Sequence, residues 1–472
     1  MNVDVLNSYG NINEEKLDEL LKEEIANNKD KIVVLDDDPT GVQTVHDVNV
    51  YTDWSYESIL DGFNEENKVF YILTNSRGMT AETSERVHRE IGKTVAKVSE
   101  ATRKPYMIIS RSDSTLRGHY PMETDVLRQE IEKEDNIIDG EILCPFFKEG
   151  GRYTIENIHY VKQGEELVPA AETEFARDVT FGYENSYIPD YIEEKTKGSF
   201  KSEDVVCITI NELRDEKIEE ITQKLCGVTG FGKICVDAID YCDLKVFMIA
   251  LYRAINKGKR YMYRTAAGFV KIMGGISDKP LLKRNDMVKR KTKMGGIVVV
   301  GSHTAKTTAQ LSKLLTLENT VPIEFDSDKV IESDEAFWEE VKRCVEEEER
   351  IIRAGKTAVC YTRRKLIRLQ DDTKDKALLR SVKISDGVQS LVGLLNTTPS
   401  FVMAKGGITS SDVGTKALKV HKARVLGQIQ PGIPVWQTGD ESRFPETPYV
   451  IFPGNTGDEE TLKTAVQILM EK

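Results

Sequence analysis

The first half of the chain alternates short apolar runs with longer amphipathic segments. The apolar runs are IVVLDD, VFYILTNS, YMIISRSD, DGEILCPFF, DVVCITI and GKICVDAI. Segments such as ETSERVHREIGKTVAKVSEAT lie between them and carry a helical pattern of apolar positions. Buried strands that alternate with helices are typical of a largely parallel sheet covered by helices. We therefore predict an α/β fold for this half.

A second set of apolar runs begins near residue 295 and indicates a second domain. These runs are GGIVVVGS, TVPIEFD, TAVCYTR, SFVMAKGG and PYVIFPGN. The stretch between the two sets, residues 276–295, is rich in Gly and Lys and lacks a regular apolar pattern. A chain of 472 residues is also too long for one hydrophobic core. We predict two domains, residues 1–280 and 290–472, each a largely parallel sheet with flanking helices.

The stretch IVVLDDDPTG ends a predicted buried strand in three consecutive aspartates, Asp36, Asp37 and Asp38. Like charges repel at this range, and burial raises carboxyl pKa values, so a cation, a ligand or catalysis must offset the arrangement. Two interpretations compete. The segment fits the D-x-D-x-T start of haloacid dehalogenase-like phosphatases, with Asp36 as nucleophile. Alternatively, the acids belong to a kinase and hold a polyol or a metal ion while ATP supplies the phosphoryl group.

Two more strand ends in the first domain carry polar motifs, TNSRG at residues 74–78 and SRSDSTLRGH at residues 110–119. Ligands collect at the carboxyl ends of strands in open α/β sheets. Arg77, Arg111 and Arg117 could bind the carboxylate of a small acid, while Asp and Ser bind its hydroxyl groups. The alternative is a structural ion network in which these arginines neutralise the aspartates. His159, in the segment CPFFKEGGRYTIENIHYV with Lys148 and Arg152, is most simply a hydrogen-bonded structural histidine.

The second domain holds the better candidate for a phosphate site. The segment Gly227–Lys233 matches G-x-x-x-x-G-K, but Ile234 replaces the Ser or Thr that would meet magnesium, and the loop precedes a strand. We interpret it as a turn. In contrast, SFVMAK runs into GGITSSDVG at residues 406–414, where Thr409 or Ser410 could cap a helix over TKALKV. Gly301–Ser302 and the late glycines Gly454 and Gly457 lie at two further strand ends.

Composition narrows the classes of partner. A net charge of -13 and a pI of about 5.3 argue against a nucleic-acid partner. We find no secretory pattern at the start and no stretch apolar enough to span a bilayer, so we expect a cytoplasmic protein with no membrane partner. The seven cysteines lack zinc-ligand spacing and are expected to be buried thiols.

Taken together, these motifs resemble those of the four-carbon acid sugar kinase family over nearly the whole chain. The resemblance is carried by DDDPTGVQTVHDV, TNSRG, DSTLRG, CPFFKEGGRYT, FARDVTFGY, VVVGSHTAKTT, MAKGGITSSDVG, GQIQPGIPVWQTG and YVIFPGN. It implies an N-terminal domain that binds an acid sugar and a C-terminal domain that binds ATP. The implied reaction is ATP-dependent phosphorylation of the terminal hydroxyl of threonate, erythronate or a 3-oxo-tetronate.

The resemblance and the strand-end positions together give a set of candidate residues. The candidates are Asp37 and Asp38 for catalysis; Arg77, Arg111, Ser112, Asp113, Ser114 and Arg117 for the substrate; and Ser302, Gly406, Gly407, Ile408, Thr409 and Gly454 for the nucleotide. One aspartate would orient the acceptor hydroxyl or accept its proton, and another would hold Mg²⁺ directly or through water. Asp36 lies outside the family pattern, and its role is left open.

Two alternatives remain beside the kinase. In the phosphatase interpretation, VFYILTNS supplies a second motif, and Lys233, Asp237 and Asp240 supply the later ones. The other alternative is a non-catalytic sensor of sugar acids. The sequence leaves open the exact acid, the metal ligands and the oligomeric state, a homo-oligomer included.

Overall fold

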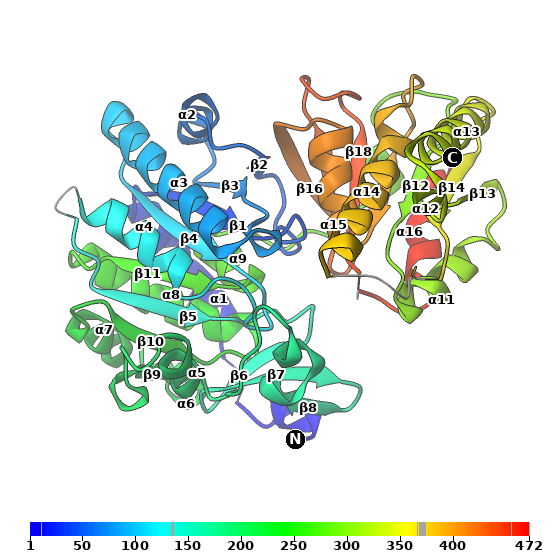
Figure 1. The fold of residues 1–472 in the computed structure, drawn as a ribbon. Helices are drawn as coiled ribbons and strands as arrows, with labels where there is room; N and C mark the ends of the chain where they lie inside the picture. The colour runs from blue at the N-terminus through cyan, green and yellow to red at the C-terminus, as the bar shows by residue number, and fades with distance from the viewer. Residues whose placement is uncertain (11, 134–135, 366, 368–373, 455, 472) are drawn as a thin grey trace. The chain divides into compact units, whose positions relative to one another are not determined.

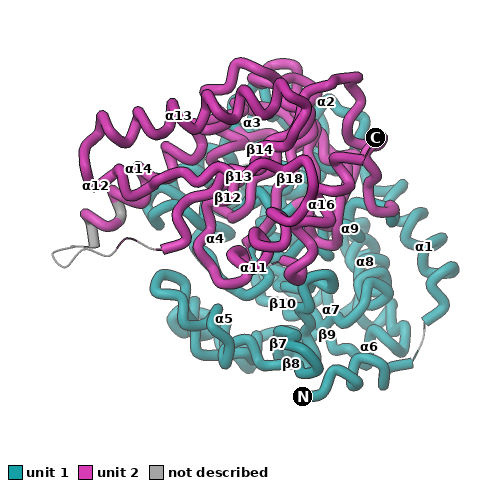
Figure 2. The backbone as a smooth tube through the Cα atoms, turned by 90° about the vertical axis from the view of Figure 1, so that its right-hand side faces the viewer, with its two compact units in different colours: residues 1–41, 53–278 teal, residues 42–52, 279–472 magenta. Residues whose placement is uncertain are grey.

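A computed structural model describes residues 1–10, 12–133, 136–365, 367, 374–454 and 456–471. The chain divides into two compact units, shown in different colours in Figure 2. Unit 1 comprises residues 1–41 and 53–278, and unit 2 comprises residues 42–52 and 279–472. The segment 42–52 belongs to unit 2 because its short strand β2 (Asn49–Tyr51) pairs antiparallel with β16 (Lys422–Gln430).

Unit 1 contains a parallel sheet with the strand order β3-β1-β4-β11-β5-β10-β9. Its strands are β1 (Lys31–Asp36), β3 (Val69–Leu73), β4 (Tyr106–Arg111), β5 (Gly140–Cys144), β9 (Val206–Ile208), β10 (Gly232–Val236) and β11 (Tyr261–Thr265). Every residue of β1 and β3 is buried, so both faces of the sheet are covered there. Burial on both faces explains why these strands read as continuous apolar runs in the sequence.

Two groups of helices cover this sheet. Helices α2 (Tyr56–Asn64), α3 (Ala81–Thr102) and α4 (Met122–Glu132) pack side by side, as Figure 1 shows. The other group consists of α1 (Glu14–Asn27), α6 (Ile210–Arg214), α7 (Ile218–Gly227), α8 (Tyr241–Asn256) and α9 (Ala267–Met273). Helix α3 shows how the sequence encodes this packing. The hydroxyl of Thr80 caps its first turn, and Val87, Ile91, Val95 and Val98 bury one face.

A small antiparallel sheet is inserted between β5 and β9. It consists of β6 (Arg152–Ile155), β7 (Ile158–Gln163) and β8 (Glu166–Pro169), and helix α5 (Ile188–Lys195) follows it. A cluster of buried residues, including Leu116, Val161, Tyr183 and Tyr191, joins this insertion to the loop after β4. The insertion therefore supports one of the candidate strand-end loops.

Unit 2 contains a mixed sheet with the strand order β13-β14-β12-β15-β18-β17-β16-β2. The first five strands are parallel, namely β12 (Ile297–Val300), β13 (Thr320–Phe325), β14 (Thr357–Thr362), β15 (Val402–Lys405) and β18 (Pro448–Phe452). Strand β17 (Ile433–Thr438) pairs antiparallel with both β16 and β18. The predicted α/β class is confirmed, and the largely parallel character holds on the side of the sheet that carries the glycine-rich loops.

The helices of unit 2 also form two groups that pack among themselves. One group comprises α10 (Arg284–Met287), α11 (Ala305–Leu314) and α16 (Thr461–Met470), and the other comprises α12 (Lys329–Glu332), α13 (Asp334–Arg353), α14 (Lys374–Gly393) and α15 (Gly407–Asp412). Val298, Met403 and Val450 of the sheet lie in one core cluster with Leu311 and Leu462 of the first group. None of the helices in the described part of the chain is both long and apolar enough to cross a membrane.

Candidate functional site

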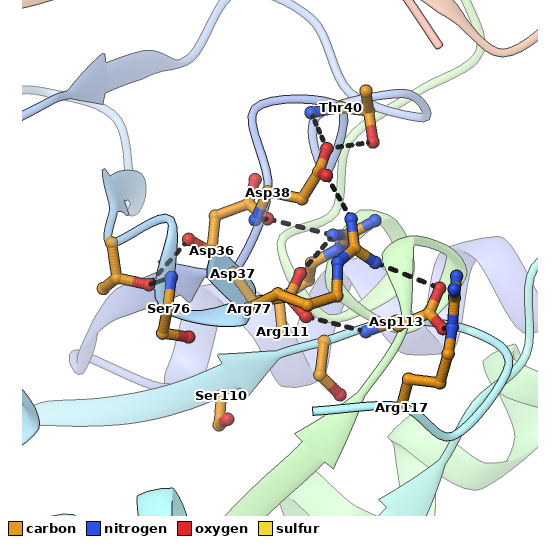
Figure 3. A network of polar contacts seen from close by, with 12 residues as sticks. Asp36, Asp37, Asp38, Thr40, Ser76, Arg77, Ser110, Arg111, Asp113 and Arg117 are labelled. Atoms are coloured by element: carbon orange, nitrogen blue, oxygen red, sulfur yellow. Dashed lines mark hydrogen bonds and ion pairs between the residues drawn. The ribbon is translucent and has the colours of Figure 1, made fainter. Parts of the chain in front are cut away.

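The parallel register of unit 1 brings three polar loops to the same edge of the sheet. Asp36 at the end of β1 is paired in register with Leu73 of β3 and with Arg111 of β4. The segments after these residues therefore begin side by side. They contain Asp37 and Asp38, then Arg77, then Asp113 and Arg117, and Figure 3 shows these side chains pointing toward one another.

Arg111 neutralises two of the three consecutive aspartates. Its Nη1 donates to Oδ1 of Asp36 at 3.0 Å and to Oδ1 of Asp37 at 3.2 Å. All three side chains are at most 5% exposed. The Nε of Arg111 is also buried, with no hydrogen-bond partner among the described residues. In this structure Arg111 forms the ion network that the sequence offered as the alternative to substrate binding.

Arg77 neutralises the third aspartate and joins it to the loop after β4. It pairs with Asp38, and its Nη1 lies 3.2 Å from Oδ1 of Asp113. Asp38 Oδ1 also accepts hydrogen bonds from the amide and the hydroxyl of Thr40, at 2.9 and 2.6 Å. Burial alone would raise the pKa of Asp38, but Arg77 and Thr40 outweigh burial and the pKa is lowered. Asp38 is thus held as a carboxylate.

Asp37 lies in a different environment from Asp38. Its Oδ2 accepts the backbone N–H of Asp113 at 3.1 Å, while Oδ1 faces Arg111. Burial is the largest influence on this carboxyl and raises its pKa despite Arg77 and Arg111. A raised pKa makes Asp37 a better proton acceptor than Asp38.

Asp36 is the most enclosed of the three. Its side chain is 1% exposed, and burial raises its pKa to about 7 even though Arg111 opposes the shift. The turn after the strand closes over it, because a Cβ placed on Gly41 would lie 2.0 Å from Asp36 Oδ1. Glycine at position 41 is therefore a packing requirement, and Asp36 is a buried partner of Arg111.

The loop Ser112–Gly118 is fixed from beneath by four buried or largely buried side chains. Four consecutive carbonyls accept their hydrogen bonds: Ser114 from His159 Nε2 at 2.7 Å, Thr115 from Tyr183 at 2.8 Å, Leu116 from Tyr191 at 2.9 Å and Arg117 from Arg264 Nη2 at 3.5 Å. Three of the four donors come from the insertion or the segment after it. Burial lowers the pKa of His159 to about 4, so this histidine is neutral and structural. Sequence reasoning did not connect these donors with the site.

The remaining candidate residues of this loop have distinct positions. Asp113 receives Arg77 at one oxygen and the Nε of Arg117 at the other, at 2.7 Å. Ser112 is buried and turns toward β11, since its amide and hydroxyl both donate to the carbonyl of Thr265 at 2.8 and 3.5 Å. Ser114 is also buried. The structure therefore groups Asp113 and Arg117 with the aspartates and Arg77, and places the Ser112 hydroxyl apart from them.

Glu123 and Arg264 form a buried ion pair beneath this site that the sequence analysis missed. Glu123 also accepts from Ser76, which directly precedes Arg77, at 2.6 Å. Arg264 donates to the hydroxyl of Ser110 at 3.0 Å. Arg264 could have been found from the sequence. It is a charged residue near the end of the apolar run YMYRT, just as Asp36 is a charged residue at the end of IVVLD.

Unit 2 contains a cavity of about 410 Å³ at its glycine-rich strand ends. All six nucleotide candidates line it, namely Ser302, Gly406, Gly407, Ile408, Thr409 and Gly454. The register of the sheet brings these residues together. Val300 at the end of β12 pairs with Lys405 at the end of β15, and Lys405 pairs with Phe452 at the end of β18. The lining also includes Ala377, Ile384 and Val388 of α14. The cavity is thus lined by glycine-rich loops and by apolar side chains.

The helix after the glycine pair begins earlier than expected. Helix α15 starts at Gly407, with Gly406 at the cap position and no side-chain cap, so Thr409 and Ser410 lie inside the helix. A π-helical turn, Val413–Ala417, follows in place of the helix expected over TKALKV. The expected capping role of Thr409 or Ser410 is therefore wrong. The φ of +120° at Gly406 lets the chain enter a helix directly from the strand.

Lys405 ties two of these strand ends together from inside the fold. Its side chain is fully buried, and Nζ donates to the carbonyls of Pro453 and Gly454 at 2.7 and 3.0 Å. Burial lowers its pKa to about 7, and the nearby Lys306 adds to this effect. Lys405 therefore positions Gly454 at the cavity.

The segment Gly227–Lys233, which resembles a phosphate-binding loop in sequence, has no such role in the fold. Lys233 lies on β10, is buried, and donates to Glu141 at 2.5 Å. Its Nζ also lies 3.7 and 4.2 Å from the ring centres of Phe231 and Phe200. The interpretation of this segment as a turn before a strand is confirmed.

The phosphatase interpretation requires Asp36 to meet a lysine and further acids, and the structure separates them. Lys233, Asp237 and Asp240 belong to β10 and the residues after it, and β10 is four positions from β1 in the sheet. At the usual spacing of about 4.8 Å between neighbouring strands, this separation is roughly 19 Å. Asp237 accepts the amides of Asn157 and Ile210, and Asp240 pairs with Lys148. These residues do not complete a phosphatase site around Asp36.

Within the described residues, no group of three or more His, Cys, Asp or Glu side chains has the arrangement of a metal site. The oxygens of Asp37 and Asp38 already accept hydrogen bonds from Arg111, Asp113, Thr40 and Arg77. A Mg²⁺ ion held directly by these carboxylates would have to share oxygens that already accept hydrogen bonds.

Comparison with known proteins identifies the class of the chain. Residues 32–273 match the model of a sugar-binding N-terminal domain, and residues 297–462 match that of a nucleotide-binding C-terminal domain. The first match alone covers more than half of the chain. The chain therefore belongs to the family that joins these two domains, which is the architecture of the four-carbon acid sugar kinase family.

Solved structures share the fold. A Haemophilus influenzae protein is 16% identical with a TM-score of 0.62, and the match covers 93% of this chain and 100% of that one. A Salmonella typhimurium protein, provisionally named a tRNA synthase, is 15% identical with a TM-score of 0.63, and the match covers 92% of this chain and 98% of that one. At these identities the likeness concerns the fold alone. No curated protein sequence matches the chain.

The ion network predicts a stability effect for Arg111. Replacing Arg111 with Met leaves Asp36 and Asp37 buried without their shared cation, and we expect the free energy of unfolding to fall by about 3 kcal/mol or more at pH 8. The control is Arg86→Met, which removes an exposed pair with Glu90 and should cost less than about 1 kcal/mol. Urea denaturation of both variants gives the comparison. If the Arg111→Met and Arg86→Met proteins were equally stable, Arg111 would not be the cation that stabilises Asp36 and Asp37.

Asp36 predicts a pH dependence of stability. A folded-state pKa of about 7, above the unfolded value of 3.8, means that Asp36 contributes stability at low pH that is lost as the pH rises toward 7. In Asp36→Asn this loss should be absent. Between pH 5 and 7 its free energy of unfolding should fall less steeply than that of the wild type, by up to about 1.4 kcal/mol per pH unit. If the free energy of unfolding of the two proteins changed with pH in the same way, Asp36 would not have the raised pKa.

Proposed function

We propose that this protein is an ATP-dependent kinase that phosphorylates the terminal hydroxyl of a four-carbon acid sugar such as threonate, erythronate or a 3-oxo-tetronate. One observation carries the proposal. The chain joins a sugar-binding domain with a charged cluster at its strand ends to a nucleotide-binding domain with a glycine-lined cavity. A sugar-acid sensor would need the first feature only, and the phosphatase alternative leaves the second unused.

The cavity of unit 2 suits a nucleotide on chemical grounds. The glycines at positions 406, 407 and 454 allow backbone amides to approach phosphate oxygens closely, and Ser302 adds a hydroxyl. The apolar side chains of Ile384, Val388 and Ile408 offer a surface for a purine ring. ATP, when bound there, supplies the phosphoryl group. Mg²⁺ is proposed to arrive with the nucleotide, held by its phosphates and by water.

In unit 1 the roles divide according to the environment of each aspartate. Asp37 has the raised pKa and adjoins the Asp113 loop, so we assign it the task of orienting the acceptor hydroxyl and accepting its proton. Asp38 is held ionised by Arg77 and Thr40, so we assign it an electrostatic and positioning role. Arg77, Asp113 and Arg117 are partly accessible and are proposed to contact the sugar acid. Arg111, Ser112 and Ser114 are proposed to act through the shape of the loop.

The direct test is a coupled assay of ADP release over threonates, erythronates and 3-oxo acids. The proposal expects ADP formation that depends on one of these acids, together with an equal amount of phosphorylated acid. The same preparation should not hydrolyse phosphate esters of these acids. Hydrolysis without ATP would favour the phosphatase, and binding of an acid without turnover would favour the sensor.

The catalytic assignment predicts a difference between neighbouring aspartates. We expect Asp37→Asn to lower kcat by about 100-fold or more, the scale for losing a positioned proton acceptor. Asp36→Asn is the matched control, because it makes the same substitution at the preceding residue. This variant should retain much of the activity. Steady-state kinetics with saturating ATP gives both values. A large loss in Asp36→Asn with little loss in Asp37→Asn would reverse the assignment.

The nucleotide assignment predicts the effect of a bulky residue in the glycine-rich loop. Gly407→Val should place a branched side chain where phosphates approach and abolish detectable ATP binding in calorimetric titration. Gly227→Val is the control, because Gly227 lies in the look-alike segment and a Cβ there meets nothing within 4 Å. It should leave ATP affinity unchanged. Undiminished affinity in a folded Gly407→Val protein would move the nucleotide site elsewhere.

A further inference from the structure

Arg152 is the first residue of β6, in the small inserted sheet of unit 1. Its guanidinium carbon lies 5.4 Å from the centre of the Phe175 ring. The guanidinium carbon of Arg117 lies 5.1 Å from the same centre. One aromatic ring thus supports two cations, one of which belongs to the candidate sugar site.

Arg152 differs from the other arginines near the site in having no acidic partner. Arg77, Arg111, Arg117 and Arg264 each form an ion pair with a carboxylate. Among the residues that the structure describes, the side chain of Arg152 forms neither an ion pair nor a hydrogen bond, and its Nε is buried without a partner. Burial also lowers its pKa from the ordinary value.

No acid already in the site is free to serve Arg152. Asp113 lies within electrostatic reach, but its two oxygens are taken by Arg77 and Arg117. Asp178 faces Arg117 at 3.7 Å. The Arg152 side chain is partly exposed, but its Nε is shielded from water and no carboxylate lies beside the guanidinium among the described residues, so an anionic ligand would supply the missing counter-charge. Stacking on Phe175 alone does not satisfy the five N–H donors of a guanidinium.

We propose that Arg152, with Arg117 on the same ring, binds the carboxylate of the acid substrate and so selects sugar acids over neutral polyols. The inference rests on the proposed function, because it names the group that recognises the acid end of that substrate. A guanidinium matches a carboxylate through two parallel hydrogen bonds, a geometry that an ammonium cannot reproduce. The reacting hydroxyl is at the other end of a four-carbon acid, which leaves the aspartates free for it.

The test compares wild type, Arg152→Gln and Arg152→Lys in calorimetric titrations with threonate and erythronate, without ATP. Each acid is paired with the corresponding neutral tetritol. We expect the wild type to bind one of the acids more tightly than its tetritol. Arg152→Gln should weaken acid binding about ten-fold or more and leave tetritol binding unchanged, so that the preference disappears. Arg152→Lys should recover only part of it.

The matched control is Lys148→Gln, which removes one positive charge from the same hairpin. Lys148 is exposed and pairs with Asp240 at 2.7 Å, so this change should leave acid binding unaltered. Thermal unfolding of the ligand-free proteins adds a second readout. Losing a charge that has no acidic partner should not lower the Tm of Arg152→Gln, whereas the Tm increase produced by the acid should be lost.

The outcomes separate this inference from the proposed function. Unchanged acid affinity in Arg152→Gln, or an equal loss of acid and tetritol binding, overturns the role of Arg152. A lower Tm of the free variant with an unchanged acid preference identifies a structural arginine and also overturns it. If the wild type binds acids through Arg152 but transfers no phosphoryl group from ATP, the inference stands and the kinase proposal fails.

Discussion

The alternation of carboxylates and guanidinium groups at the carboxyl edge of the unit 1 sheet is the interaction on which the rest of the site depends. Asp36 and Asp37 share Arg111, and Asp38 and Asp113 share Arg77. Three adjacent aspartates at the end of a buried strand would otherwise repel one another. Arg111, at the end of β4, holds two acids at the end of β1, and Arg77 bridges Asp38 to Asp113 in the loop after β4. The network therefore also fixes these loops relative to each other. The same ion pairs thus neutralise the aspartates and hold the loops in position.

The same network gives chemically identical side chains different properties. Asp36 is enclosed beneath Gly41, Asp37 is buried beside the Asp113 amide, and Asp38 is pinned by Arg77 and Thr40. Their pKa values move apart accordingly, upward for the first two and downward for the third. Separation of pKa values within a cluster is how neighbouring acids acquire separate tasks. The candidate site of unit 2 has no such cluster of acids among the described residues that line it. Its cavity is lined by the backbone of glycines, and the buried Lys405 holds two of the strand ends together.

The sequence predicted the features that depend on local pattern. Continuous apolar runs identified β1, β3, β4, β12, β15 and β18, and the rule that ligands collect at strand ends led to the loops that the register brings together. The sequence could not show that Arg111 faces the aspartates, since this depends on which strands are neighbours. It also missed the hydrogen bonds that His159, Tyr183 and Tyr191 donate to the loop after β4, because these residues lie 45 to 75 positions further along the chain, in the inserted sheet and the segment after it. The start of α15 was misplaced because Gly406 enters the helix without a side-chain cap.

We propose that the three aspartates act as an electrostatic and proton-accepting cluster and never carry the phosphoryl group themselves. Mass spectrometry of the peptide that contains Asp36, Asp37 and Asp38, after acid quench of a reaction with ATP and a four-carbon acid, tests this most directly. Direct in-line transfer needs no phosphoenzyme, so the peptide should be recovered unmodified while phosphorylated acid accumulates. A phosphoryl group trapped on Asp36 would contradict the account and would establish that residue as a nucleophile.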